Sequence, residues 1–173
     1  ITFGGKSISE VCDLSVSDCI EFFNNTSLTE REQFIAKEII NSNTAYNLME
    51  NGNDTRSDEE IKKQFLQKDS ESYFLKADDT YIGIVDFMLN NPKDDTPWIV
   101  LFIIHHDYQG YGYGSIAYDN LEQHLHNRGL VKLRLAILHE NEGAKRFWES
   151  FGYRYFRTGE ANGQTVDCYE KDI

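Results

Sequence analysis

The sequence predicts an α/β domain with a mixed sheet and flanking helices. Helical spacing of apolar residues dominates the N-terminal third, whereas the later part alternates short apolar strands with turns. Two helical segments interrupt those strands, so the expected order is helices, then β-β-β-α-β-α-β-β. With 173 residues, 40% apolar and 13% aromatic, the chain suffices for one domain with a core of its own.

The N-terminal helices are predicted from spacing and capping residues. Ser15–Phe23 carries apolar residues at helical intervals, and Thr29 precedes acidic residues as an N-cap would. The helix that Thr29 opens ends near Ser42, residues 51–57 form a loop, and Asp58–Leu66 is a further helix. We expect the following side chains to face the core: Phe34, Ile35, Ile39, Ile40, Ile61, Phe65 and Leu66.

The strand region begins with a hairpin and a central strand. Ser72–Lys76 and Thr80–Leu89 flank a tight turn at residues 78–79. Trp98–Ile104 is apolar on both faces, which is typical of a strand that is covered on both sides. The remaining elements, in order, are a helix at Tyr113–Asn127 that Gly129 ends, a strand at Leu130–Leu138 with Val131, Leu133, Leu135 and Ile137 inward, a helix from the cap Asn141 to Ser150, and a hairpin of Tyr153–Arg157 and Gln164–Tyr169.

Charge and composition exclude several classes of protein. The chain has 29 acidic and 17 basic residues, a net charge of -12, and such a surface repels a phosphate backbone. We therefore expect no nucleic acid partner. No stretch resembles a spanning helix or a signal peptide, so we expect a cytoplasmic protein without a membrane partner. The three cysteines form no C-x-x-C pair, so no metal site is expected.

The segment most informative about chemistry is the glycine-rich turn Gln109–Ser115. Glycines at alternate positions let a ligand approach the main chain, and the first N–H groups of the helix that follows have no intrahelical partner. These groups favour an anion, so the turn predicts a phosphate or pyrophosphate site. A turn that needs glycine for its conformation alone would show the same residues. No P-loop lysine follows, and Gly112, Gly114 and Ala117 meet the dinucleotide fingerprint only in a relaxed form.

Two motifs in order give a resemblance to a known family. From about Asn43 onward the sequence resembles the GCN5-related N-acetyltransferase (GNAT) superfamily. The family's [QR]-x-x-G-x-[GA] motif corresponds to Gln109, Gly112 and Gly114, and its second motif corresponds to Asn141, Ala144, Phe147-Trp148 and Gly152-Tyr153. The resemblance implies a mostly antiparallel sheet.

The resemblance implies acetyl-CoA as cosubstrate, no metal, and direct acetyl transfer to a primary amine of a small molecule, peptide or protein. It places acetyl-CoA between the splayed strands 98–104 and 130–138, with the N–H of Phe102 facing the thioester carbonyl. A fixed donor there would stabilise the charge that develops on that oxygen. The strand at Ile103 and Ile104 would hold the pantetheine arm. The other residues implied in cofactor binding are Gln109, Gly110, Tyr111, Gly112, Tyr113, Gly114 and Ser115 for the pyrophosphate, with Asn141, Arg146 and Phe147 from the second motif.

Proton transfer is where the sequence departs from the family. An amine with a pKa of about 10.4 must lose a proton before it attacks. The strand 98–104 has no acid, and Trp148 stands where many relatives have tyrosine. Asp86 and Tyr153 are the candidate groups. The alternative for Asp86 is a place at an exposed edge of the sheet, and the alternative for Tyr153 is packing in the aromatic core. A non-catalytic acyl-CoA-binding or interaction module on the same fold is therefore the second hypothesis. The acceptor amine and a homodimer are both left open.

The N-terminus resembles a different protein. Residues 1–39 resemble a segment of the A subunit of the excinuclease ABC complex, without that family's ATPase motifs or zinc cysteines. We interpret residues 1–42 as a helical segment acquired ahead of an acetyl-CoA-binding domain at 43–173. Ile1–Phe3 is the candidate for the missing first strand of the sheet.

Overall fold

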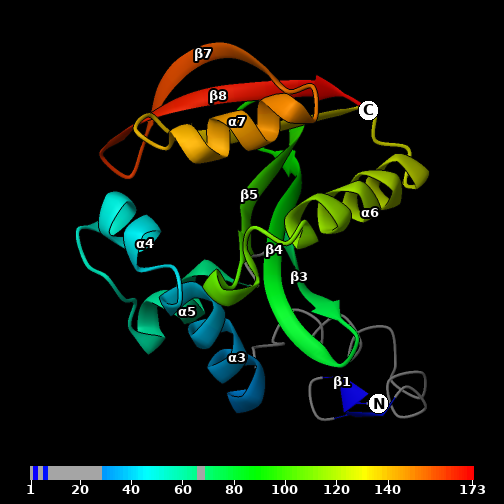
Figure 1. Ribbon diagram of the computed structural model, residues 1–173. Coiled ribbons are helices and arrows are strands. Elements are labelled where there is room, and N and C mark those ends of the chain that lie inside the picture. Colours follow the sequence, from blue (N-terminus) through cyan, green and yellow to red (C-terminus); the bar gives the residue numbers. More distant parts are fainter. Residues whose placement is uncertain (1, 4–5, 8–28, 66–68) are drawn as a thin grey trace.

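Six strands form one sheet in the order β3-β4-β5-β6-β8-β7 (Figure 1). The pair β5–β6 is parallel and every other neighbouring pair is antiparallel, which confirms the predicted mixed, mostly antiparallel sheet. The computed structural model describes residues 2–3, 6–7, 29–65 and 69–173. The strands are β3 (Ser70–Ala77), β4 (Thr80–Asn91), β5 (Thr96–Ile104), β6 (Lys132–Leu138), β7 (Arg154–Ala161) and β8 (Gln164–Asp172).

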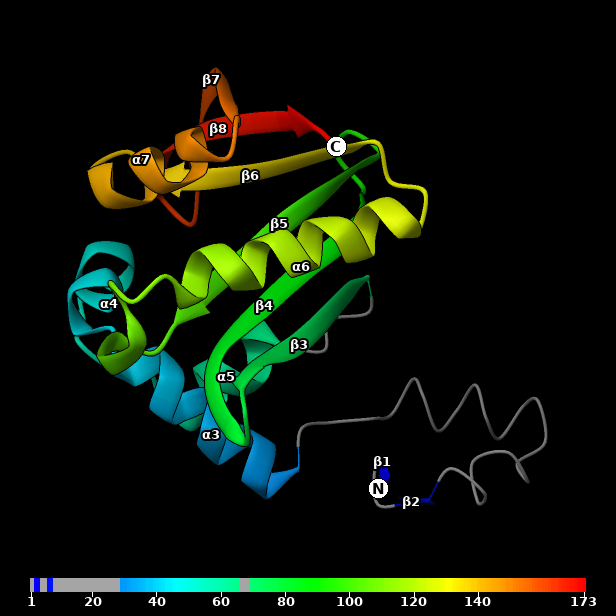
Figure 2. The same ribbon diagram turned by 45° about the vertical axis from the view of Figure 1, so that its right-hand side comes forward.

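Helices cover the sheet on both faces (Figures 1 and 2). On one face, α6 and α7 pack through Tyr118, Leu125 and Trp148 against β4, β5 and β6. On the other face, α3 and α5 pack through Ile40 and Ile61 against β4 and β5. The helices are α3 (Glu30–Asn41), α4 (Thr44–Asn51), α5 (Asp58–Gln64), α6 (Tyr113–Asn127) and α7 (Glu142–Ser150), and a short 3-10 turn, η1 (His106–Tyr108), follows β5.

Local hydrogen bonds explain where two helices begin. Thr29 Oγ1 accepts from the Glu32 N–H at 3.2 Å, and the Glu32 carboxylate accepts from the Thr29 N–H at 2.8 Å. Ser57 and Glu60 repeat this capping box at the start of α5. The N-cap predicted at Thr29 is confirmed.

Helix α4 has no counterpart among the predicted elements. Its Leu48 side chain is 53% exposed and its buried residue is Asn47, so the apolar stripe that marks a helix in a sequence is missing. The structure therefore shows a helix in a segment for which the sequence predicts no element.

Three expectations about the core and the strands are wrong. Phe34 and Val131 are 64% and 71% exposed, and β6 begins only at Lys132. Apolar spacing alone predicts both side chains inward. Phe34 instead shares the exposed face of α3 with Glu30 and Glu38. Val131 precedes the first residue of β6. The strand expected at Ile1–Phe3 does not join the main sheet, because Thr2–Phe3 (β1) pairs with Lys6–Ser7 (β2). Ser15–Phe23, Ile1 and Leu66 lie outside the described residues.

Strands β5 and β6 separate along their length. They pair at Trp98 with Arg134 and at Ile99 with Leu135. Beyond these pairs β5 continues to Ile104 and β6 to Leu138 without further pairing in this described region. The splay that the family resemblance implies is therefore present at the centre of the sheet.

Helix α3 belongs to the same packed unit as the sheet. Its residues Ala36, Ile39 and Ile40 share a core cluster with Leu101 and Ile103 of β5. The boundary predicted at 42/43 stays a prediction about the origin of the N-terminal segment. Among the described helices, none has the length and apolar character needed to cross a membrane.

Candidate active site

The register of β4 and β5 decides which way the β5 main chain points. In an antiparallel pair, hydrogen-bonded and non-hydrogen-bonded residues alternate. The His105 N–H donates to the Ile82 carbonyl at 2.8 Å, so His105 and Ile82 form a hydrogen-bonded pair. Phe102, opposite Val85, and Ile104, opposite Gly83, then fall in non-hydrogen-bonded pairs. Their N–H groups therefore point away from β4 and into the splay between β5 and β6.

The glycine turn leads from β5 into α6 with an open main chain. Gly110 and Gly112 have φ angles of 81° and 84°, and a Cβ built on either would meet nothing within 4 Å. Gly112 is the N-cap of α6 and makes no side-chain cap hydrogen bond. The first amides of α6, at Tyr113, Gly114 and Ser115, are those that an α-helix leaves without a helical acceptor. Open space beside unpaired amides fits a pyrophosphate.

Gln109 is engaged within the protein. Its N–H donates to the His106 carbonyl at 3.1 Å, and its Nε2 donates to the Ile104 carbonyl at 2.9 Å and to Asn43 Oδ1 at 2.7 Å. The amides that remain for an anion thus begin at Gly110. Gln109 fixes the start of the turn to the end of β5.

The second motif meets the first at the splay. Asn141 Oδ1 accepts from the Ala144 N–H at 3.0 Å and so caps α7 as predicted. Phe147 of α7 stacks on Phe102, with ring centroids 6.1 Å apart. A Cβ built on Gly114 would lie 3.6 Å from Phe147, so α7 and the start of α6 are in contact range. The structure therefore brings together residues that are about 45 positions apart in sequence.

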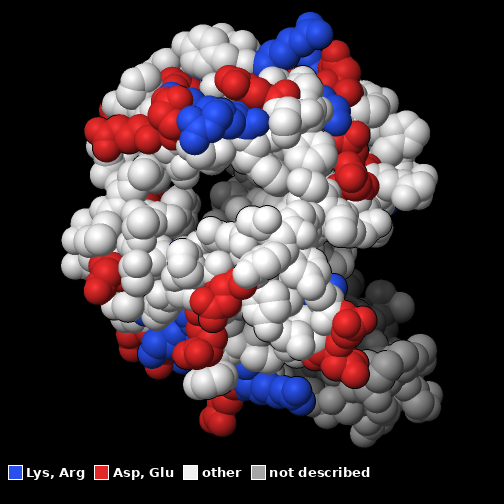
Figure 3. Space-filling model, viewed as in Figure 1, with Lys and Arg blue, Asp and Glu red and all other residues white. Residues whose placement is uncertain are grey.

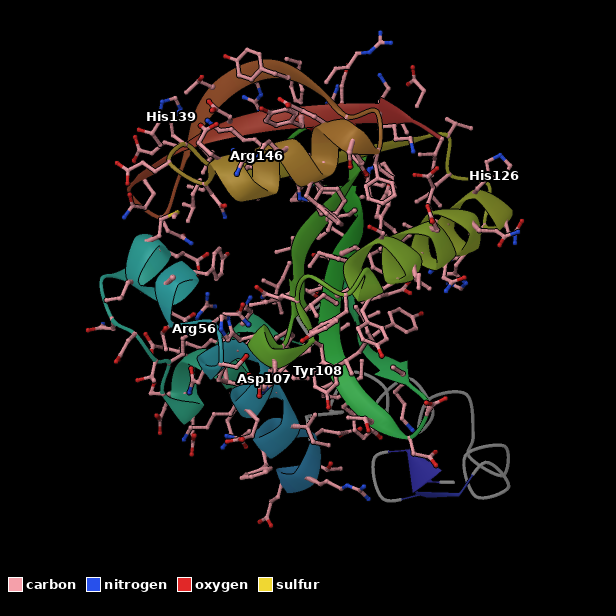
Figure 4. All side chains as sticks on the ribbon, in the orientation of Figure 1. Arg56, Asp107, Tyr108, His126, His139 and Arg146 are labelled. Atoms are coloured by element: carbon pink, nitrogen blue, oxygen red, sulfur yellow. The ribbon has the colours of Figure 1, made fainter. Side chains whose placement is uncertain are left out.

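A hollow marks this meeting point on the surface. Figure 3 shows the molecule hollowed between α7, α4 and β5, with an uncharged surface over the start of α6. Arg146 projects from α7 at the upper rim (Figure 4), and its side chain is exposed. The neighbouring Lys145 pairs with Asp167 and Glu142, both at 3.0 Å. Arg146 is thus the better placed of these two α7 cations for a phosphate.

Asp86 lies on the sheet face opposite α6 and α7. Its side chain is 1% exposed and accepts a hydrogen bond from Ser72 Oγ of β3 at 2.8 Å. Burial raises the pKa of its carboxyl group, and the serine hydroxyl opposes that shift. Because its partner lies on β3, the carboxyl is held on the side of β4 away from the splay. This geometry favours a structural role, and catalysis by Asp86 stays a prediction.

Tyr153 sits in the core below α6 and α7. Its side chain is 2% exposed, and its hydroxyl lies 3.0 Å from that of Tyr118, which donates to Glu122 at 2.5 Å. Burial raises the pKa of Tyr153 above its ordinary range. Trp148 packs edge-on against both tyrosines. Tyr153 as a catalytic group stays a prediction, and its position is that of a core residue.

Most of the chain matches one known family. The sequence model of the Acetyltransferase (GNAT) family matches residues 36–153. The chain belongs to the GNAT acetyltransferase family. This GNAT protein also shares its fold with solved structures that are under 25% identical to it. An acetyltransferase from Thermus thermophilus is 20% identical, with a TM-score of 0.71 over 85% of this chain and 94% of that one.

Two further solved structures share this fold. The PaiA N-acetyltransferase from Thermoplasma acidophilum, in complex with coenzyme A, is 15% identical with a TM-score of 0.62, covering 85% of this chain and 96% of its own. The ribosomal-protein-S18-alanine N-acetyltransferase from Escherichia coli is 17% identical with a TM-score of 0.64, covering 86% and 92%. These similarities support the fold of the GNAT protein.

A short segment matches a different kind of protein. UvrABC system protein A of Mycobacterium tuberculosis (strain CDC 1551 / Oshkosh) is 51% identical over 37 residues, which are 21% of this chain. The chain spans about 4% of the length of that curated relative. The excinuclease resemblance predicted from the sequence is confirmed for a short segment.

Sequence reasoning missed Asn43. The sequence places it only at a domain boundary, yet its side chain contacts both the end of β5 and Gln109. The one available signal was an Asn at the end of a predicted helix, a pattern that ordinarily indicates a cap.

Proposed function

We propose that this GNAT protein is an acetyl-CoA-dependent N-acetyltransferase that transfers acetyl directly to a primary amine. The observation that carries the proposal is the common edge formed by two sets of main-chain amides. The N–H groups of Phe102 and Ile104 point into the splay, and the open turn at Gly110–Ser115 leads into α6 beside it. Such an edge suits a long ligand with a diphosphate at one end and a carbonyl at the other.

The residues along this edge have separate roles in the proposed reaction. Acetyl-CoA supplies an activated acetyl thioester. The amides from Gly110 to Ser115 bind the diphosphate, and Arg146 adds a positive charge at the rim. The Ile104 N–H holds the pantetheine arm, with Asn141 on the α7 side. The Phe102 N–H donates to the thioester carbonyl oxygen, where negative charge develops as the amine attacks.

The residues of the splay also limit how protons move. Phe102, Phe147 and Trp148 surround the reacting end with apolar rings, which excludes water and aligns the two reactants. No acidic side chain belongs to β5. We propose that the amine enters as the free base or loses its proton to water, with Asp86 and Tyr153 as the alternatives to test.

The test combines binding with turnover. Acetyl-CoA should raise the unfolding temperature of the full chain, and thiol release should follow with at least one amine in a panel of small amines, peptide N-termini and lysine peptides. Desulfo-CoA should also stabilise the protein but release no thiol. If neither acetyl-CoA nor desulfo-CoA raises the unfolding temperature, the proposal is contradicted.

A second function is a non-catalytic acyl-CoA-binding module. It is favoured by one observation, the buried indole of Trp148, which is 7% exposed and cannot protonate a leaving thiolate. Stabilisation by acetyl-CoA without thiol release across the amine panel and across pH would favour this module over the enzyme.

A further inference from the structure

Asn43 links three distant parts of the chain. Its Nδ2 group donates to the Ile104 carbonyl at 3.1 Å and to the Ile39 carbonyl at 3.0 Å. Its Oδ1 accepts from Gln109 Nε2 at 2.7 Å. The residue is 8% exposed, so these bonds are shielded from water. One carboxamide thus joins the end of α3, the end of β5 and the start of the glycine turn.

Asn43 stands at the N-cap of α4 but does not act as a cap. An asparagine in that position usually accepts from an amide in the first helical turn, which stabilises the helix by about 1 kcal/mol. Asn43 makes no such bond. Besides its bond to Ile39, its amide group contacts Ile104, 61 positions away, and its oxygen contacts Gln109, 66 positions away. Capping of α4 therefore does not explain the two distant bonds.

The Ile104 carbonyl is the shared target of these contacts. Because Ile104 lies in a non-hydrogen-bonded pair with Gly83, its carbonyl and its N–H point to the same side, into the splay. The carbonyl accepts from both Asn43 and Gln109. Two donors on one carbonyl fix the orientation of this part of the strand and leave the N–H directed at the ligand.

A second contact strengthens the same connection. Ser42, the residue before Asn43, accepts from the His106 N–H through its Oγ at 3.0 Å. The junction between α3 and α4 is therefore bonded to the chain on both sides of His105. Helices that lie outside both family motifs thereby support the main chain that carries the first motif.

We propose that Asn43 is a positioning residue for the acyl donor. It holds the Ile104 peptide and the Gln109 side chain so that the amide edge of β5 and the turn before α6 stay in one arrangement. The proposal rests on the proposed function, because it assumes that the donor binds along this edge. Asn43 does not itself touch the reacting atoms.

A matched control is available on the next turn of the same helix. Asn47 is 0% exposed, and it bonds to the Ile40 carbonyl at 3.0 Å, the Asp54 carbonyl at 3.1 Å and Arg56 Nε at 3.2 Å. All these partners lie between residues 40 and 56. Loss of the Asn47 side chain therefore removes buried hydrogen bonds without touching β5 or the glycine turn.

The experiment compares three variants of the full chain, Asn43→Ala, Asn43→Asp and Asn47→Ala. Unfolding is followed by circular dichroism, and the affinity for acetyl-CoA is measured by calorimetry at a temperature where each variant is folded. We expect Asn43→Ala to weaken acetyl-CoA binding about tenfold. Asn43→Asp should weaken it at least as much, because a carboxylate would face the Ile104 carbonyl. Asn47→Ala should lose stability but bind acetyl-CoA within about twofold of wild type.

The outcomes separate the possible explanations. Equal weakening by Asn43→Ala and Asn47→Ala, or none by Asn43→Ala, would overturn the positioning role. If neither Asn43 variant folds, Gln109→Ala tests the same contact from the turn: weakening of about tenfold supports the role, and an unchanged affinity overturns it. A wild-type protein that does not bind acetyl-CoA would reject the proposed function itself, a result visible before any variant is compared.

Discussion

The substitution Gly112→Ala tests whether the turn before α6 binds the donor through its main chain. Gly112 has a φ of 84°, a conformation that costs an L-residue about 1–2 kcal/mol. In a domain of this size that loss corresponds to roughly 2–4 °C of unfolding temperature per kcal/mol. The added methyl group meets no protein atom within 4 Å, so it projects into open space beside the turn. We expect it to obstruct a phosphate that approaches the amides of this turn.

Gly129 provides the control at the opposite end of the same helix. Its φ is 85°, and a Cβ built there also meets nothing within 4 Å. Gly112→Ala and Gly129→Ala should therefore lose similar stability, whereas only Gly112→Ala should weaken acetyl-CoA binding, by about tenfold or more. Calorimetric titration of both variants at one temperature measures this difference. An acetyl-CoA affinity that is the same in both variants would refute the main-chain cradle.

Three further predictions concern salt, pH and the buried tyrosine. Residues 94–127 contain no Lys or Arg, and the proposed function assigns a single cation, Arg146, to the diphosphate. The acetyl-CoA affinity should therefore weaken less than about threefold between roughly 50 and 500 mM NaCl, and a steeper loss would indicate that several cations bind the donor. Burial raises the folded-state pKa of Asp86, so its contribution to stability is present below about pH 4 and is lost as pH rises through the raised pKa. Asp86→Asn should remove this contribution from the pH dependence of the unfolding free energy and should leave turnover unchanged. A loss of turnover of about a hundredfold would identify Asp86 as the base. Tyr153→Phe deletes the hydroxyl that contacts Tyr118. It should lower the free energy of unfolding in denaturant by about 1 kcal/mol and keep turnover within about threefold of wild type. A far larger loss of turnover would identify Tyr153 as catalytic.

Elements with strong local signals could be predicted from the sequence. Thr29 and Asn141 mark helix starts because their side-chain oxygens bond to amides only three residues away. The bounds of α6 follow from Gly112 and Gly129, whose positive φ values end regular structure at either side. Such short-range interactions leave a pattern that a sequence shows directly.

Features that depend on distant contacts could not be predicted in the same way. Phe34 is apolar and lies close to Ile35 in α3, but the buried face of that helix carries Ala36 and Ile40, and Phe34 lies on the other face. Asn43 is a residue type that commonly caps helices, yet its side chain bonds to Ile104 and Gln109. The glycine turn predicted an anion site, and the structure adds that Gln109 serves the protein while the amides from Gly110 onward remain for a ligand.

The central claim is that main-chain amides bind acetyl-CoA. The NMR resonances of those amides test this claim directly. In a 15N-labelled full chain titrated with acetyl-CoA, we expect the largest shifts at Phe102, Ile104 and Gly110–Ser115. The amide of Gly129, at the far end of α6, should stay unchanged. Shifts concentrated elsewhere, with those at Phe102 and Gly110–Ser115 unmoved at saturation, would contradict the account.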